Sequence, residues 1–330
     1  RQQAREYLAE FFLKVRGQHF SIGGRLQDGS DASCEMSFVV LEAYDMIDDY
    51  NNLFLMWHKD IDPALFRYAC DVLVRHGASV PSLANYDLLV DCELRSGVDP
   101  DIAWTVSVSG CQWFCIPGRE YCDQDVNALV LLDPMWRAID RAVTENAGDF
   151  EVFYRLFEAE FRRTVEALRL FKDAQYEVLD RVWPEIATSL NCHGPIERGV
   201  DITGPRGVDV QYTSTNILGL PNVADSLHAI KKLVYEEGRY TMAEVREATK
   251  ENWKGREEMR QRFLNEDKFG NDLDEVDGMY VRICDMIAGV LDNTFNSRGQ
   301  QYRASLFQFQ GHTCVDVLPA TPDGRLAEEP

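Results

Sequence analysis

The sequence lacks an apolar run long enough to cross a membrane, and it lacks the basic and apolar segments of a secretory signal. It also has no P-loop and no dinucleotide-binding fingerprint, although Gly23 and Gly24 are adjacent. No Cys-x-x-Cys pair occurs, and no histidine lies between His76 and His193. These absences argue against a membrane protein, a nucleotide-binding enzyme and a zinc site.

Basic residues are also few. The 330 residues include 34 Lys and Arg against 55 Asp and Glu, which gives a net charge of −21. Such an acidic chain repels phosphate backbones, so we expect no nucleic-acid partner. Hydrophobic residues make up 45% of the chain, which is typical of a soluble globular protein.

The nine cysteines are odd in number and scattered through apolar-patterned segments, which predicts a reducing, cytoplasmic setting rather than a disulfide framework. Cys111, Cys115 and Cys122 lie close in sequence, but without a nearby histidine a zinc or iron–sulfur site there is disfavoured. Because the chain begins at Arg1 rather than Met, we expect a fragment of a longer protein.

Hydrophobic periodicity and turn residues predict helices alternating with short strands, which favours an α/β fold. The predicted helices are 1–17, 33–57, 62–76, 86–97, 136–190 with breaks near 147–148 and 183–184, 221–237, 241–254 and 277–296. The predicted extended segments are 81–85, 104–109, 206–217 and 305–317. No internal repeat or clear linker is visible.

The run SGCQWFCIPGR at 109–119 contains the main candidate for chemistry, Cys111. A glycine precedes this cysteine and Gly118 follows it, which places the thiol at the tip of a tight loop. Alone the signal is weak, because cysteine is more often a small buried apolar residue than a reactive one.

Five stretches together carry a resemblance to the glycyl radical enzymes, the pyruvate formate-lyase-like family. They are GGRLQDGSDASCEMS at 23–37, PSLAN at 81–85 followed by Gly110-Cys111, GLPNVADSLHAIKKLV at 219–234, KFGNDLDEVD at 268–277 and TPDGR at 321–325. Each is moderately specific, and their order makes the resemblance strong from about residue 20 to the end.

The resemblance implies a ten-stranded α/β barrel, here partial, with residues 1–330 forming a barrel fragment and the cysteine loop at about 104–120 inside it. The family's radical glycine lies on a second loop, in a motif after TPDGR that residues 1–330 do not contain. The resemblance also implies no bound metal, a radical SAM iron–sulfur activating enzyme that installs the glycyl radical, a small-molecule substrate and a homodimer.

In the family, the catalytic cysteine gives its hydrogen to the glycyl radical and then takes one from the substrate. The following Gly118-Arg119 stands at the family spacing from Cys111 and not from Cys115, so the resemblance assigns Cys111 as the thiyl residue. For Cys115 and Cys122 we expect packing roles.

Position 113 departs from the family pattern. The eliminating and decarboxylating branches have a glutamate there, and Trp113 cannot replace it in proton transfer. The expectation is therefore addition of a hydrocarbon to fumarate, as in benzylsuccinate and alkylsuccinate synthases. Trp113 and Phe114 would form the apolar wall, and Arg119 would bind a carboxylate or pack at the loop base.

Further substrate-binding candidates are His193, which the resemblance places near the barrel, and Gln308, Gln310 and His312, which alternate on the predicted strand 305–317. Structural roles are the alternative for each of them. Other functions stay open: another glycyl radical lyase, a formate acetyltransferase-like enzyme, a non-catalytic homologue of the fold, or a thiol hydrolase, which would need a histidine close to Cys111.

Overall fold

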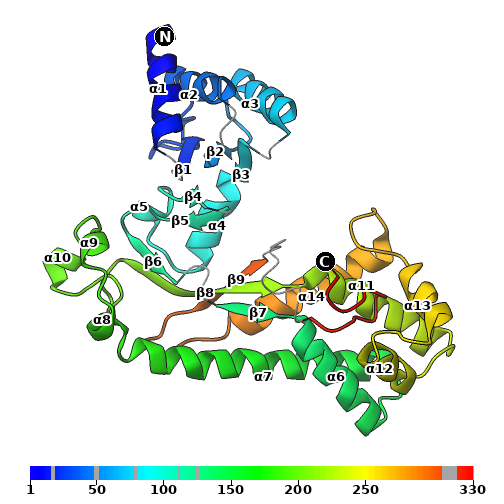
Figure 1. Cartoon of the computed structure of the whole chain (residues 1–330). Coiled ribbons are helices and arrows are strands. Elements are labelled where there is room, and N and C mark those ends of the chain that lie inside the picture. Colours follow the sequence, from blue (N-terminus) through cyan, green and yellow to red (C-terminus); the bar gives the residue numbers. More distant parts are fainter. Residues whose placement is uncertain are drawn as a thin grey trace. The chain divides into compact units, whose positions relative to one another are not determined.

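The computed structural model describes residues 1–15, 19–47, 52–77, 80–110, 112–123, 127–306 and 318–329. The chain divides into two compact units, and each is considered by itself. The first contains residues 1–120, 187–199 and 206–210, and the second contains the remaining residues. Both mix helices with sheet, as Figure 1 shows, so the predicted α/β class is confirmed.

A parallel three-stranded sheet in the order β1-β2-β3 organises the first unit. Its strands are β1 (His19–Gly23), β2 (Asn52–Trp57) and β3 (Ser82–Asn85). The central strand reads NLFLMW and its middle residues are buried, as expected for a parallel strand covered on both faces. The unit also contains α1 (Gln2–Lys14), α2 (Glu35–Asp45), α3 (Pro63–His76), α4 (Tyr86–Arg95), α5 (Pro100–Ala103), α10 (Pro195–Arg198), β4 (Ser107–Ser109) and β5 (Trp113–Cys115).

The prediction of one helix over 33–57 is wrong. Helix α2 ends at Asp45, and the apolar run that follows forms the central strand β2. A short continuous apolar run fits a buried strand and a buried helix equally well, so periodicity alone could not separate the two.

Helix α3, by contrast, follows its local signals. The side chain of Asp62 accepts a hydrogen bond from Ala64 N at 2.8 Å and caps the helix, and Pro63 occupies the first turn. Gly77 ends the helix with a left-handed φ of +61°. The predicted helix at 62–76 is thereby confirmed.

The second unit contains β8 (Val210–Leu218) except for its first residue, and β8 pairs with three other strands and is parallel to β7 and β9. Those strands are β6 (Glu120–Cys122), β7 (Ala128–Val130) and β9 (Tyr302–Leu306). The helices are α6 (Leu132–Glu145), α7 (Phe150–Tyr176), α8 (Leu179–Val182), α11 (Leu220–Ile230), the π-helical η1 (Lys231–Glu236), α12 (Met242–Lys250), α13 (Glu257–Leu264) and α14 (Asp274–Leu291). The short α9 (Ile186–Ser189) begins at the boundary of the two units.

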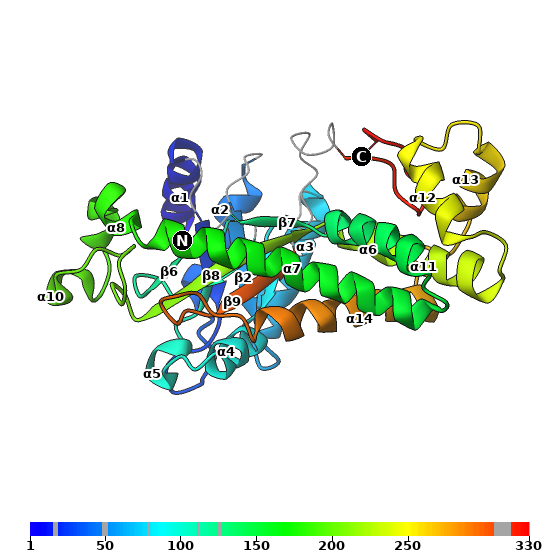
Figure 2. The ribbon, with the colours of Figure 1, turned by 90° about the horizontal axis from the view of Figure 1, so that it is seen from below.

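The core of the second unit lies between α7 and the β8 sheet. Phe153, Phe157 and Phe161 of α7 are fully buried and share one hydrophobic cluster with Ile217 of β8 and Tyr302 of β9. Figure 2 shows α7 and α14 running along this sheet. Burial of these rings stabilises the second unit, at about 25 cal/mol per Å² of apolar surface.

Candidate active site

The cysteine run forms a β-hairpin in the first unit. Strands β4 and β5 are antiparallel, and Ser109 is paired with Trp113 at the end of the ladder. The connection runs through Gly110 and Gln112, both left-handed, with φ of +55° and +71°. Position 111 therefore falls within a tight connection between two strands, while Cys111 itself lies outside the described residues.

Three side-chain contacts tie this hairpin to strand β1. His19 Nδ1 accepts a hydrogen bond from the backbone N–H of Gly110. Ser21 Oγ accepts from Ser107 Oγ at 2.7 Å and donates to the carbonyl of Val108 at 3.4 Å. His19 escaped the sequence analysis because it lies 91 residues from Gly110 along the chain, and no local motif marks it. Its Nδ1 already accepts from the backbone, so that nitrogen is not available as a thiol hydrolase base.

The two aromatic candidates differ in their surroundings. The Trp113 side chain is buried, with 8% of the residue exposed. Phe114, which points to the other face of the strand, packs against the apolar cluster that contains Phe54 and Tyr86. A role of either ring as substrate wall remains a prediction.

Cys115 is an inert neighbour. Its Sγ lies 3.9 Å from Ser109 Oγ. Burial, and then the nearby Glu120 carboxylate, raise the pKa of the Cys115 thiol to about 11. The thiol therefore stays protonated at neutral pH, which fits the packing role predicted for it.

Arg119 is held at the base of the hairpin in an ionic cluster. Its Nη1 donates to Asp209 Oδ2 at 2.7 Å, and Arg198 donates to the other oxygen of the same carboxylate. Although burial opposes it, hydrogen bonds from both arginines lower the pKa of Asp209. The cluster contains two guanidinium groups and one carboxylate, so the Arg119 guanidinium is already paired within the first unit.

His193 comes close to the same loop base. Its backbone N–H donates to the carbonyl of Gly118 at 2.8 Å, and its ring carbon Cδ2 would lie 3.8 Å from a Cβ at position 118. The first unit thus brings together Arg119 and His193, which lie far apart in sequence. The remaining candidates, Gln308, Gln310 and His312, lie outside the described residues, as does most of the predicted strand 305–317 beyond the end of β9.

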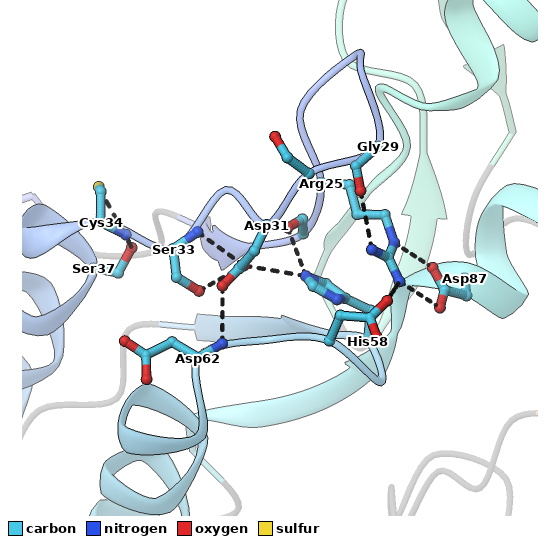
Figure 3. A network of polar contacts seen from close by, with 12 residues as sticks. Arg25, Gly29, Asp31, Ser33, Cys34, Ser37, His58, Asp62 and Asp87 are labelled. Atoms are coloured by element: carbon cyan, nitrogen blue, oxygen red, sulfur yellow. Dashed lines mark hydrogen bonds and ion pairs between the residues drawn. The ribbon is translucent and has the colours of Figure 1, made fainter.

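The first of the five motifs forms a hydrogen-bonded loop, drawn in Figure 3. His58 is fully buried, and its Nε2 lies 2.9 Å from the carbonyl of Gly24 and 3.2 Å from Asp31 Oδ1. Asp31 also accepts from Asp62 N at 2.8 Å, while Arg25 binds Asp87 with two nitrogens. These contacts fasten the glycine-rich segment to the ends of β2 and α3, which is a structural role.

Within the described ranges, no three or more His, Cys, Asp or Glu side chains gather as a metal site. No helix in those ranges combines the length and apolarity of a membrane span.

The chain is similar in sequence to one known protein family and to individual proteins. A sequence model of the family described as pyruvate formate lyase-like matches residues 2–315. The chain is 26% identical over 345 residues to the probable dehydratase YbiW of Escherichia coli K12, covering 95% of this chain and 42% of that protein. It is 25% identical over 333 residues to the isethionate sulfite-lyase of Bilophila wadsworthia, covering 93% and 39%.

Solved structures show the same fold. A Roseburia inulinivorans structure described for 1,2-propanediol dehydration matches with a TM-score of 0.91 and 24% identity, over 100% of this chain and 46% of that one. A glycyl radical enzyme from Archaeoglobus fulgidus matches with a TM-score of 0.87 and 20% identity over the same shares. The chain spans less than half the length of these proteins.

These relatives bear on the expected reaction. They include dehydratases and a carbon–sulfur lyase, and they support the alternative of a glycyl radical lyase better than the addition of a hydrocarbon to fumarate. Trp113 alone favoured the fumarate-adding branch, whereas overall similarity favours the eliminating enzymes.

Proposed function

Since the chain belongs to the pyruvate formate lyase-like family, we propose that it is the cysteine-bearing part of a glycyl radical lyase acting on a small polar molecule. The observation that carries this proposal is the hairpin connection at position 111. Left-handed Gly110 and Gln112 flank the cysteine, and β1 side chains hold the strand before it.

We further propose that the described strands belong to the ten-stranded α/β barrel that the family resemblance implies, with residues 1–330 as one barrel fragment. A closed barrel would keep water and oxygen away from a reactive sulfur. The hairpin would then hold Cys111 close to the carbon on which it acts, since hydrogen transfer requires near-contact.

In the proposed reaction, the sulfur of Cys111 removes a hydrogen atom from a substrate C–H bond. The leaving group departs from the adjacent carbon, and the product radical recovers the hydrogen atom from the Cys111 thiol, so the net change is elimination. A glycyl radical, installed in this family by a radical SAM iron–sulfur enzyme, would supply the unpaired electron.

In the proposed lyase, the side chain at position 113 is a tryptophan and not a glutamate. An indole does not exchange a proton near neutral pH, so a group other than the side chain at position 113 must protonate the departing hydroxyl. The buried ring would instead contribute apolar contact beside the sulfur.

The test uses the full-length protein after activation. Candidate substrates for elimination are 1,2-propanediol, glycerol, trans-4-hydroxy-L-proline and isethionate, with toluene plus fumarate as the competing assay. We expect turnover in the first group, complete loss of it in Cys111→Ala and Cys111→Ser, and an unchanged glycyl radical signal in electron paramagnetic resonance. Cys115→Ala is the matched control and should retain activity. Turnover in Cys111→Ala, or activity with toluene and fumarate alone, would refute the proposal.

A further inference from the structure

Strand β1 presents two polar side chains to the cysteine hairpin. His19 and Ser21 are two residues apart, so they project from the same face of the strand. Ser21 contacts Ser107 and Val108 in the body of β4, whereas His19 contacts Gly110, the residue immediately before Cys111.

The contact with His19 gives the backbone N–H of Gly110 a hydrogen-bond acceptor that the hairpin ladder does not provide. The ladder ends at the Ser109–Trp113 pair, so the N–H of Gly110 has no partner in the β4–β5 register. A loop N–H of this kind is ordinarily bonded to water or to a side chain. Here the imidazole of His19 accepts it, which fixes the Ser109–Gly110 peptide plane, one residue before position 111.

The bond also defines the form of the histidine. Because Nδ1 accepts from Gly110, Nε2 is the ring nitrogen left to donate a hydrogen bond. Nε2 lies 3.4 Å from the amide nitrogen Nδ2 of Asn52, the residue paired with His19 in the β1–β2 register. An Asn52 amide that turns its oxygen toward Nε2 would complete the pair, since the two ends of an amide are assigned from such networks.

We propose that His19 is a positioning residue for the catalytic cysteine, acting through the backbone of Gly110. This inference rests on the proposed function of Cys111. The reason is geometric: the thiol must approach the substrate carbon closely, and a small displacement of the loop lowers the rate strongly without changing how substrate binds.

The test compares three substitutions of His19 in the activated full-length enzyme. In His19→Asn, the amide oxygen occupies nearly the place of Nδ1 and can still accept from Gly110. In His19→Gln the acceptor is displaced by one methylene, and in His19→Leu it is lost. We expect His19→Leu and His19→Gln to lower kcat roughly 10- to 100-fold with KM within about twofold, and His19→Asn to restore most of kcat. Because His19 is exposed, these changes leave the core intact.

Ser21→Ala is the matched control, since it removes contacts from the same face of β1 to the same hairpin but not to Gly110. An equal loss of kcat in Ser21→Ala, or no rescue by His19→Asn, would overturn the positioning role. Full activity in His19→Leu, with Cys111→Ala inactive, would overturn this inference alone. Activity in Cys111→Ala would instead remove the proposed function on which it rests.

Discussion

The side-chain amide of Asn222 donates a hydrogen bond to Asp323 Oδ2 at 3.2 Å, although the two residues are 101 positions apart. The backbone N–H of Asp323 donates in turn to Ser226 Oγ at 3.2 Å. Two of the motifs behind the family resemblance, at 219–234 and 321–325, therefore meet in the second unit as one structural contact. Their co-occurrence in the sequence reflects this packing.

Gly324, within that contact, should not tolerate a side chain. Its φ is +94°, and an added Cβ would lie 2.5 Å from Cγ of Leu264 and 3.2 Å from its backbone nitrogen. We expect Gly324→Ala to lower the free energy of unfolding by roughly 2–4 kcal/mol, through left-handed strain and overpacking. Gly299→Ala is the control: its φ is +76° with nothing within 4 Å, so it should cost only about 1 kcal/mol. Urea unfolding measures both, and equal losses would contradict the packing argument.

Lys172 and Asp123 form a buried ion pair in the second unit, with 1% and 7% of each residue exposed. Asp123 also accepts from Tyr176 Oη at 2.8 Å and Asn127 Nδ2 at 2.9 Å. Lys172→Met would leave the carboxylate buried without its cation and should destabilise the protein by about 3–5 kcal/mol.

The double variant Asp123→Asn/Lys172→Met tests the cause of that loss. It removes both charges, so it should recover more than half of the stability lost in Lys172→Met. Arg162→Met, which breaks an exposed pair with Glu158, should cost less than about 0.5 kcal/mol. A double variant no more stable than Lys172→Met would show that lost packing, and not the unpaired charge, dominates.

Asp225 makes stability depend on pH. Burial raises the pKa of this carboxyl to about 6 from an ordinary value of 3.8, against a hydrogen bond from Phe269 N at 2.8 Å. The folded state therefore binds the proton more tightly than the unfolded state, and ionised Asp225 costs stability above pH 6. That cost disappears as the pH falls from 6 to 4.

Asp225→Asn keeps the acceptor oxygen and removes the titration. The stability of the variant relative to that of the natural protein should rise by roughly 1–3 kcal/mol as the pH increases from 4 to 7. This range allows for partial solvent screening of the carboxylate. Thermal unfolding at several pH values measures this difference. A difference that does not change with pH would exclude Asp225 as the titrating group.

His58 should contribute more to the first unit than its exposed neighbours. It is fully buried and contacts both the Gly24 carbonyl and Asp31. His58→Leu would remove a buried hydrogen bond to these two acceptors, which keep their bonds from Ala32 N and Asp62 N. The loss should cost about 1–3 kcal/mol, the range for a hydrogen bond to a charged group. Asp60→Asn, which affects one exposed contact of Arg25, should change stability by less than about 1 kcal/mol. Equal effects in denaturant unfolding would refute this ranking.

The sequence predictions succeeded where neighbouring residues determine the structure and failed where contacts between distant residues determine it. Helix α3 was predictable because Asp62, Pro63 and Gly77 determine its ends within a few residues of chain. Strand β2 was not, because its identity depends on pairing with β1 and β3, which no local pattern records. The same limit concealed His19, whose importance arises only when the sheet brings it to Gly110.

The division of the chain into two units limits what truncation of the chain can test. Segments 187–199 and 206–210 belong to the first unit, although they follow the whole of the helix-rich segment 121–186 of the second. A truncation after Glu120 would therefore remove Arg198, Asp209 and the segment that contacts Gly118, and a ribosome must translate Val210 before the first unit is whole. Neither unit can be isolated by a single cut, so the properties of each unit have to be tested by substitution in the intact chain.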